Sequence, residues 1–331
     1  MSVRPEGSEY VVDAASAGVR FDKWLADPQR LQSRSRSARA LLRGQVFVND
    51  REQTLADGAR RLVAGDRVRI WLDRPLSAHR QGPHRTGQLD IVFEDHDVIV
   101  LDKPAGLLTV PLPEQPHAES LADRIAIHWR SHGRLPMAVH RLDRDTSGLV
   151  VFARTGLARA RLKAQFVERR PERRYVAVVN GIPTSASGEW RTWLVWDGRL
   201  RRQLACDAAT PRAFEAISHY VVREAFDSVG AALLEVRLTT GKRHQIRAQA
   251  WLNGHPLIGE RMYVAVTATH VPPIFAFERQ ALHACRLSFH HPRTEELLAF
   301  EREPPSDFRQ LVDRLRESSR QPARSFRRTG K

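Results

Sequence analysis

Cysteine is scarce in this sequence, which has only Cys206 and Cys285 among its 331 residues. Two cysteines cannot build a disulfide framework or a four-thiolate zinc site, so a reducing compartment, the cytoplasm, is the expected location. Apolar runs are also short, and none approaches the roughly 18 residues that a membrane span requires. The first residues lack the apolar segment of a signal peptide. These absences argue against a disulfide-rich secreted domain and against a membrane partner.

Acidic residues are outnumbered by basic ones, with 38 Asp and Glu against 53 Lys and Arg, which gives a formal net charge of +15. Such a surplus favours a polyanionic partner, since each cation that neutralises a phosphate releases a condensed counterion. Nucleic acid is therefore the first candidate partner. An arginine-rich composition can also reflect a GC-rich genome, so the positions of the charges must decide.

Residues 17–74 form a small basic unit. Ser33 is a good N-cap for a helix that runs to Arg43 and ends at Gly44, with leucines on one face. A strand that runs into a turn is expected at 45–50, and a second strand with alternating charge at 64–72. The arginines of the helix are candidate RNA-binding residues: Arg34, Arg36, Arg39 and Arg43.

The rest of the chain divides into three parts. Residues 75–88 are polar, contain Gly and Pro, and are expected to form a linker. Residues 89–312 alternate strand-like runs (97–101, 149–152, 175–179 and 232–238) with helical stretches (120–130 and 157–169), which predicts an α+β domain. Residues 313–331 are rich in arginine and poor in apolar side chains, and are expected to be a flexible basic tail.

A candidate reactive carboxylate lies in the string His140-Arg-Leu-Asp-Arg-Asp-Thr-Ser-Gly148, just before an apolar strand. Basic neighbours favour the ionised form of a carboxylate, which is its nucleophilic form. Taken alone, this string allows a second interpretation, in which Asp143 is only an ion-pair partner of Arg141 or Arg144.

Further strings occur in a fixed order, and together they resemble the RluA-type RNA pseudouridine synthases. They are His140-Arg-Leu-Asp143 with Thr146-Ser-Gly148, Asp102-Lys-Pro-Ala-Gly-Leu-Leu-Thr-Val-Pro111, Arg174-Tyr175, Thr240-Gly-Lys-Arg-His-Gln-Ile-Arg247, Gly254-His-Pro-Leu-Ile-Gly259 with Tyr263, and Leu282-His-Ala284 with His291-Pro292. The first 74 residues resemble an S4-type RNA-binding domain through Gly18–Leu25, Ser33–Ser35, Gly44–Asn49 and Gly65–Val68. Here Asp50 stands where the family usually has glycine.

This resemblance implies a fold and a reaction. The fold is α+β, a mixed and mainly antiparallel sheet with flanking helices, preceded by the S4-like domain. The reaction turns a uridine of structured RNA into pseudouridine after the base is flipped out of its stack, without a cofactor or metal, in a protein expected to be a monomer. Asp143 would attack the nucleotide, and Arg141 would fill the space of the flipped base. Tyr175 would lie against the uracil and help to remove the C5 proton.

The string from Thr240 to Arg247 should bring a cation to Asp143. The family normally has arginine where this chain has Lys242, so either Lys242 or Arg243 is a candidate partner, and Lys242 is favoured. His140, Arg243, Gln245 and Arg247 join Arg141 as expected substrate-binding residues. Glu260 replaces the aspartate that family members usually carry, which keeps the charge.

Three other interpretations have sequence support. Asp143-Arg-Asp-Thr146 fits the pattern of magnesium-dependent phosphatases, although those proteins place it after an apolar strand. His283, Cys285, His290 and His291 could suggest a metal site, but their spacing fits no common zinc signature, so no metal is expected. A third possibility is an RNA-binding assembly factor that has lost the reaction.

The RNA target is less defined than the reaction. The S4-like domain favours 23S ribosomal RNA, but relatives also modify tRNA, and some modify both. Selectivity depends on RNA shape and on loops that one sequence does not expose.

Overall fold

The computed structural model describes residues 7–42, 44–72, 88–112, 118–129, 136–264 and 276–320. The chain folds as two compact units, one formed by residues 1–88 and 110–136 and the other by residues 89–109 and 137–331. This division differs from the predicted boundaries because 110–136 groups with the first unit. Most of the predicted linker, Arg43, the side chain of Arg39 and the last eleven residues lie outside the described residues.

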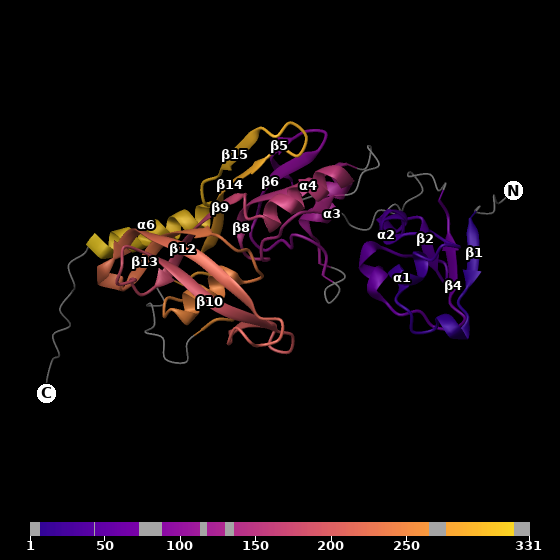
Figure 1. Cartoon of the computed structure of the whole chain (residues 1–331), viewed down its shortest axis with the longest axis horizontal. Helices are drawn as coiled ribbons and strands as arrows, with labels where there is room; N and C mark the ends of the chain where they lie inside the picture. Colours follow the sequence, from indigo (N-terminus) through magenta and orange to yellow (C-terminus); the bar gives the residue numbers. More distant parts are fainter. Residues whose placement is uncertain are drawn as a thin grey trace. The chain divides into compact units, whose positions relative to one another are not determined.

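The first unit is built around a four-stranded antiparallel sheet in the order β1-β4-β2-β3 (Figure 1). Phe21, Trp24 and Leu25 pack against the sheet in one apolar core. The predicted helix and two strands are confirmed, and the Ser33 hydroxyl accepts a hydrogen bond from the Arg36 amide at 3.2 Å. The elements are β1 (Ser8–Val11), η1 (Ala14–Ser16), α1 (Phe21–Leu25), α2 (Arg34–Leu42), β2 (Val46–Val48), β3 (Arg51–Glu52), η2 (Leu55–Ala59), β4 (Arg67–Ile70) and α3 (Leu121–His128).

The tight turn between β2 and β3 explains how the chain tolerates an aspartate in place of glycine. Asn49 and Asp50 have φ angles of 50° and 63°. Two consecutive left-handed residues are what a two-residue hairpin turn requires, and Asn and Asp adopt this conformation more readily than other residues with a side chain.

The second unit is built on an eleven-stranded sheet whose main path is β11-β10-β12-β13-β9-β14-β8-β6-β5. Only the pairing of β14 with β8 is parallel among the described strands, which confirms a mixed, mainly antiparallel sheet. The strands are β5 (Asp90–Glu94), β6 (Val98–Lys103), β7 (Met137–Ala138), β8 (Ser147–Ala153), β9 (Glu172–Asn180), β10 (Ser187–Asp197), β11 (Arg202–Ala205), β12 (Phe214–Phe226), β13 (Ala231–Leu238), β14 (Leu282–His290) and β15 (Leu297–Glu301).

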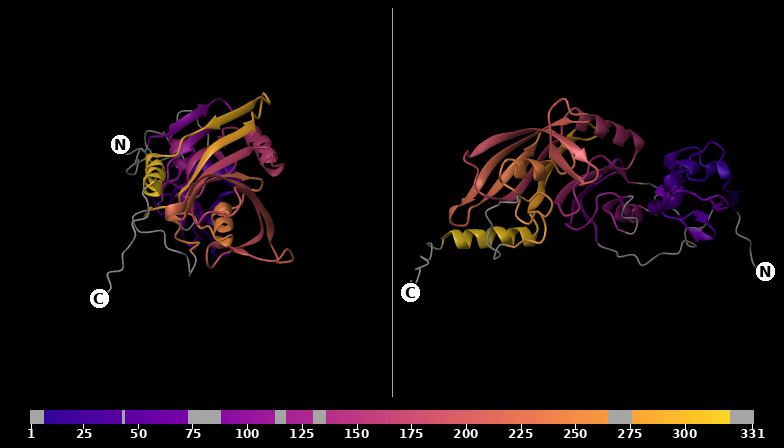
Figure 2. Two further views of the ribbon diagram at one scale, coloured as in Figure 1. Left: turned by 90° about the vertical axis from the view of Figure 1, so that its left-hand side faces the viewer. Right: turned by 90° about the horizontal axis from the view of Figure 1, so that it is seen from below.

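Three helices cover the two faces of this sheet. α4 (Gly156–Val167) packs against β8 and β14, and α5 (Gln245–Leu252) packs against β10 and β12. α6 (Ser306–Arg320) covers the opposite face, where its apolar residues meet Val178 of β9 (Figure 2). The short helix η5 (Asp227–Val229) links β12 to β13.

Helix α6 corrects the expected tail. Residues 313–320 belong to this helix, and the side chains of Phe308, Leu311, Val312 and Leu315 are buried. Their spacing of three and four residues gives one apolar stripe, which anchors the arginine-rich helix on the sheet. Of the helices in the described ranges, none has the length and apolar character needed to span a membrane.

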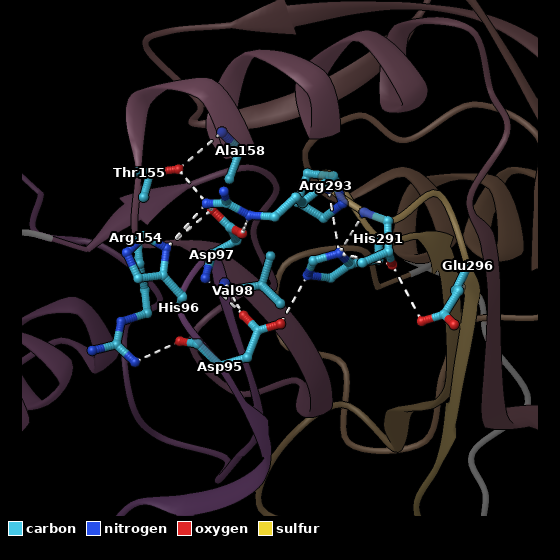
Figure 3. A network of polar contacts seen from close by, with 12 residues as sticks. Asp95, His96, Asp97, Val98, Arg154, Thr155, Ala158, His291, Arg293 and Glu296 are labelled. Carbon is cyan, nitrogen blue, oxygen red and sulfur yellow. Dashed lines mark hydrogen bonds and ion pairs between the residues drawn. The ribbon is translucent and has the colours of Figure 1, made fainter.

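Charged side chains join three loops at one end of β8 (Figure 3). Arg293 donates two hydrogen bonds to the Asp97 carboxylate, at 2.5 and 2.9 Å, and the Thr155 hydroxyl reaches the same carboxylate at 3.2 Å. His291 Nε2 lies 2.8 Å from the Asp95 carboxylate. The turn after β5, the start of α4 and the turn after β14 are thereby held together.

Candidate active site

The loop that carries Asp143 leads directly into the other end of β8. At the start of this strand, Gly148 has a φ of 115°, and a Cβ atom there would lie 2.3 Å from the carbonyl oxygen of Ala284. Only glycine allows β8 and β14 to approach so closely. The loop is therefore fixed at its strand end by backbone packing.

Lys103 also fixes the loop of Asp143. Its side chain is fully buried, and its Nζ donates hydrogen bonds of 2.8 Å to the carbonyl groups of Pro104, Leu107 and Arg144. Burial lowers the pKa of Lys103 to about 7, while Asp143 and Asp145 act in the opposite direction. Three acceptors match the three N–H groups of an ammonium. Lys103 thus ties the loop of β6 to the loop of Asp143.

His140 supports the loop as well, which differs from its expected substrate-binding role. Its Nε2 accepts a hydrogen bond from the Val151 amide at 3.2 Å, and its ring stacks on Phe166 with centroids 4.8 Å apart. Burial, aided by the charge of Arg173, lowers the pKa of His140 to about 3. The neutral ring is held by its hydrogen bond to β8 and by stacking on α4, so His140 stabilises the loop.

Asp143 forms an ion pair with Arg247 of α5. The Arg247 Nη1 donates to Asp143 Oδ2 at 3.1 Å, while Nε and Nη2 of the same guanidinium both donate to Glu260 at 2.7 Å. Arg247 and Glu260 are buried, whereas the Asp143 side chain keeps 16% of its surface exposed. Glu260 thus orients the arginine, and the open side of Asp143 is left for a substrate.

The charges around Asp143 keep it ionised. Burial alone would raise its pKa, but His244 in its protonated form, Arg247 and Arg141 outweigh that effect and hold the pKa of Asp143 below its ordinary value. At pH 7, where His244 is neutral, the charges of the two arginines remain. A carboxylate that is ionised and partly open is able to act as a nucleophile.

The cation at Asp143 is Arg247, so the favoured pairing with Lys242 is wrong. Lys242 is exposed, and its Nζ lies 5.0 Å from the Phe214 ring centroid. The Arg243 guanidinium lies over Trp196, 4.0 Å from the ring centroid. Both residues precede α5, whereas Arg247 is in its first turn and points at the loop of Asp143.

Gln245 also takes a different role from the expected one. Its amide oxygen accepts from the Thr240 hydroxyl at 2.9 Å and the Lys242 amide at 3.1 Å, and its amide nitrogen donates to Ile217 and Ser218. These four bonds use the full capacity of the side chain. Gln245 shapes the loop before α5 and offers no group to a substrate.

His244 reaches Asp143 from the start of α5. Its Nε2 lies 3.8 Å from Asp143 Oδ1, and its Nδ1 lies 3.2 Å from the Tyr263 hydroxyl. That hydroxyl accepts a hydrogen bond from the Gln203 amide at 2.7 Å, so its own proton is directed to Nδ1. The proton of the imidazole is then on Nε2, facing Asp143.

The position of His244 requires an uncommon backbone. Its φ of 55° is left-handed, and it precedes α5 without capping the helix through its side chain. Burial lowers the pKa of His244 to about 4, with Arg247 and Arg243 acting in the same direction and Asp143 opposing them. The ring is neutral at pH 7 and offers a hydrogen-bond donor without adding a charge.

Tyr175 lies on β9 with its side chain buried. Burial raises the pKa of Tyr175 to about 12, an effect that Asp143 reinforces and Arg173 opposes. The phenol is therefore protonated at pH 7. These couplings connect Tyr175 to Asp143 and to Arg173, which also lies on β9.

The expected RNA-binding arginines belong to the first unit. Arg34 and Arg36 are exposed on α2, and Arg36 donates a hydrogen bond of 2.5 Å to Gln32. The other two, Arg39 and Arg43, have side chains outside the described residues.

The histidines considered for a metal site are engaged elsewhere. His283 contacts the Ser147 hydroxyl at 3.0 Å and the Arg302 carbonyl at 3.1 Å, and His291 contacts Asp95. These contacts use ring nitrogens that a metal would need, so the structure assigns both rings to β14 and its turn.

Several residues of the site were not identified from the sequence. Arg173, His244, Glu260, Tyr263 and Lys103 all lie in or beside the quoted strings, but their roles depend on which strand face or helix turn they occupy. The one available signal was Glu260, an acid at a position where family members usually carry aspartate.

The site joins an ionised carboxylate, a fixed guanidinium and a buried phenol on the antiparallel sheet of an α+β domain. Residues 97–251 match the family model described as RNA pseudouridylate synthase. The chain is 34% identical over 313 residues to ribosomal large subunit pseudouridine synthase D of Zymomonas mobilis, covering 92% of this chain and 96% of that protein. It is 31% identical to the chloroplastic RNA pseudouridine synthase 2 of Arabidopsis thaliana, covering 94% and 83%. The chain belongs to the RluA-type RNA pseudouridine synthases and is an isomerase that acts on RNA.

Solved structures show the same fold. The structure of the human protein named RNA pseudouridylate synthase domain containing 4 superposes with a TM-score of 0.55 at 21% identity, covering 68% of this chain and 92% of that one. The structure of the human protein named RNA pseudouridylate synthase domain containing 1 superposes with a TM-score of 0.53 at 21% identity, covering 71% of this chain and 98% of that one.

Proposed function

We propose that this synthase converts a uridine of large-subunit ribosomal RNA to pseudouridine, with Asp143 as the catalytic nucleophile. The observation that carries the proposal is the ionised, partly open carboxylate held at Arg247. The relatives named for the large ribosomal subunit cover most of this chain, which supports that RNA over tRNA. The cytoplasm is the corresponding location.

The reaction divides between residues of different character. Asp143 attacks the nucleotide so that the glycosidic N1–C1′ bond breaks, the uracil turns, and its C5 joins C1′ of the ribose. The bond to Asp143 then breaks, the C5 proton is lost to solvent, and N1 takes up a proton. Arg141 is exposed beside Asp143 and is suited to fill the space left in the RNA when the base flips out. Tyr175 packs against the base as a neutral phenol, since a group with a pKa of about 12 does not accept a proton at pH 7.

The first unit is proposed to bind RNA as an S4-like domain. Support comes from the exposed arginines of α2, which are available for phosphate contacts. Changing Arg34 and Arg36 together to Ala should weaken RNA binding and lower its salt dependence, without changing turnover at saturating RNA. The matched control is Arg51→Ala, an exposed arginine on β3.

The nucleophile is tested by tritium release from large-subunit rRNA transcripts labelled at C5 of uridine. Asp143→Asn should release no tritium above background while binding RNA within severalfold of the wild type. Asp145→Asn removes a carboxylate two residues away and should keep most activity. An active Asp143→Asn enzyme, or a silent wild type on every large-subunit transcript, contradicts the proposal.

The RNA is identified by mapping pseudouridine in cells with and without the gene. Loss of one or a few sites in large-subunit rRNA is the expected result. Loss confined to tRNA would contradict the proposed target and leave the reaction unaffected.

A further inference from the structure

Arg173 is a buried cation for which the described residues offer no counter-charge. Its side chain is 7% exposed, and its Nε is shielded from solvent without a hydrogen-bond partner. Burial lowers the pKa of the Arg173 guanidinium, against a small opposing effect of Tyr175. A buried charge is costly unless it is paired, so a protein retains one where a ligand supplies the partner.

The position of Arg173 connects it to the active site. Arg173 and Tyr175 are two residues apart on β9, so both side chains project from the same face of the sheet. The charge of Arg173 acts on the pKa values of Tyr175 and of His140, which belongs to the same loop as Asp143. Arg174, between them, points to the other face and pairs with Glu172 and Glu235.

The contacts of Arg173 leave its guanidinium without an acidic neighbour. One is the Phe166 ring, whose centroid lies 5.5 Å from the guanidinium carbon. The other is Gly241, where a Cβ atom would lie 1.9 Å from Nη1, so a side chain at this position would displace the guanidinium. Gly241, in the loop before α5, therefore leaves the space that the Arg173 guanidinium occupies.

We propose that Arg173 binds a phosphate group of the RNA, the phosphodiester beside the uridine that enters at Asp143. The proposal rests on the function proposed above for Asp143. Phosphate is the only part of the substrate that brings a full negative charge to the ground-state complex, and the planar fork of arginine matches its oxygens. Arg247 already shares its charge between Asp143 and Glu260, whereas Arg173 is paired with no carboxylate among the described residues.

The test uses Arg173→Met, which keeps length and apolar bulk but removes the charge. Binding of short large-subunit rRNA transcripts is measured at equilibrium over a range of KCl concentrations, together with single-turnover rates and thermal unfolding. The dissociation constant should rise about tenfold, and the slope of log affinity against log salt should fall by about 1. The rate at saturating RNA should stay within about threefold, and the unfolding midpoint should be unchanged or higher because no internal ion pair is lost.

Arg174→Met is the matched control, since it removes an arginine from the next position on the opposite face. Glu172 and Glu235 keep the partners Arg286 and Arg223, so the control should bind RNA as the wild type does. Arg173→Lys, which keeps a positive charge without the planar fork, should restore the salt slope and part of the affinity.

Two results would overturn the proposal. Unchanged affinity with a fallen rate would show that Arg173 acts on the uracil during the reaction. Unchanged affinity with a lowered unfolding midpoint would show a structural role. Because binding is measured without turnover, failure of Asp143 as the nucleophile would appear in the tritium assay and not in this one.

Discussion

The two ends of strand β8 carry opposite arrangements of charge. At the end where β8 meets α4, cations and carboxylates are matched inside the protein: Arg293 with Asp97, and His291 with Asp95 (Figure 3). At the end that carries Asp143, the catalytic end, one guanidinium serves two carboxylates. Arg173, on the same face of β9 as Tyr175, has no carboxylate among the described residues.

The difference indicates what each end contributes. A closed network of pairs stabilises three loops and leaves nothing for a ligand. The catalytic end keeps a carboxylate partly open, and Arg173 carries a charge that no described carboxylate balances, which costs stability and suits a substrate that carries negative charge. The net charge of +15 is therefore less informative than the few positions at which charge is left unmatched.

Replacing Glu260 with Gln should have the largest effect on stability and turnover, because it removes a carboxylate that pairs with Arg247 at the catalytic end. The Glu260 carboxylate accepts two hydrogen bonds from Arg247 and also accepts from the amides of Arg261 and Met262. Breaking this buried pair should lower the free energy of unfolding by about 3–5 kcal/mol and reduce turnover as Arg247 loses its orientation. Urea unfolding and single-turnover rates measure the two effects.

The control is Glu260→Asp, which keeps the charge on a shorter side chain and should lose less of both. Equal losses in the two variants would show that the length of the side chain, and not its charge, orients Arg247.

Asp97→Asn tests the end where β8 meets α4 and the charges are paired. The free energy of unfolding should fall there, and turnover should not. Arg293, through its hydrogen bonds, holds the pKa of Asp97 at about 2 against the effect of burial. The pair therefore contributes above pH 4 and is lost as the pH falls through 2, and its removal should cost about 2 kcal/mol at pH 7. Unfolding free energy is the measurement, with turnover per folded molecule expected within about twofold.

The comparison variant is Asp207→Asn, which changes an exposed carboxylate in the loop after β11. It should change neither quantity. A fall in turnover for Asp97→Asn would mean that the two ends of β8 are coupled.

The sequence predicted the parts of the fold that depend on local pattern. The capped helix from Ser33 was recognisable from its cap and apolar face, and the strands after Gly148, at 175–179 and at 232–238 from their runs of apolar residues. Helix α6 was missed because its arginines dominate the composition, although four apolar residues recur at helical spacing.

The site was predictable only where its residues are contiguous. Asp143 was found in its string, but its partner was misassigned, because Lys242 and Arg247 are distinguished only by where α5 begins. Arg173 stands in a run of arginines and is distinguished from Arg174 only by the face of β9 on which it lies. Helix phase and strand face decide such pairings, and both are set by tertiary packing.

Acid should destabilise the catalytic domain through histidines that are buried in the neutral form. Burial lowers the pKa of His140 to about 3 and those of His244 and His283 to about 4. Since the unfolded chain binds these protons first, stability should be complete above pH 6.5 and should fall as the pH drops from 6.5 towards 4. The free energy of unfolding in urea, measured between pH 7.5 and 4.5, follows this loss.

His283→Gln isolates one of these groups, because the amide can donate to the Arg302 carbonyl and accept from Ser147 as the neutral ring does. The slope of stability against pH should become shallower by at most about 1.4 kcal/mol per pH unit. An unchanged slope in His283→Gln would mean that the other histidines cause the loss.

Tyr263→Phe should have the smallest effect and bears on the catalytic end alone. It removes the hydroxyl that accepts from Gln203 and directs its proton to His244, so the imidazole can adopt either tautomer. Stability should fall by about 1 kcal/mol. Turnover should fall a few-fold, because part of the population no longer presents an N–H to Asp143.

Tyr220→Phe is the matched control, since this buried tyrosine packs on Trp190 with ring centroids 4.9 Å apart and its change leaves the site intact. Nitrogen chemical shifts of His244 in the labelled protein report the tautomer directly. A mixed His244 tautomer with full activity in Tyr263→Phe would show that the ion pair with Arg247 alone prepares Asp143. The unmatched charge would then be the only feature that distinguishes the catalytic end.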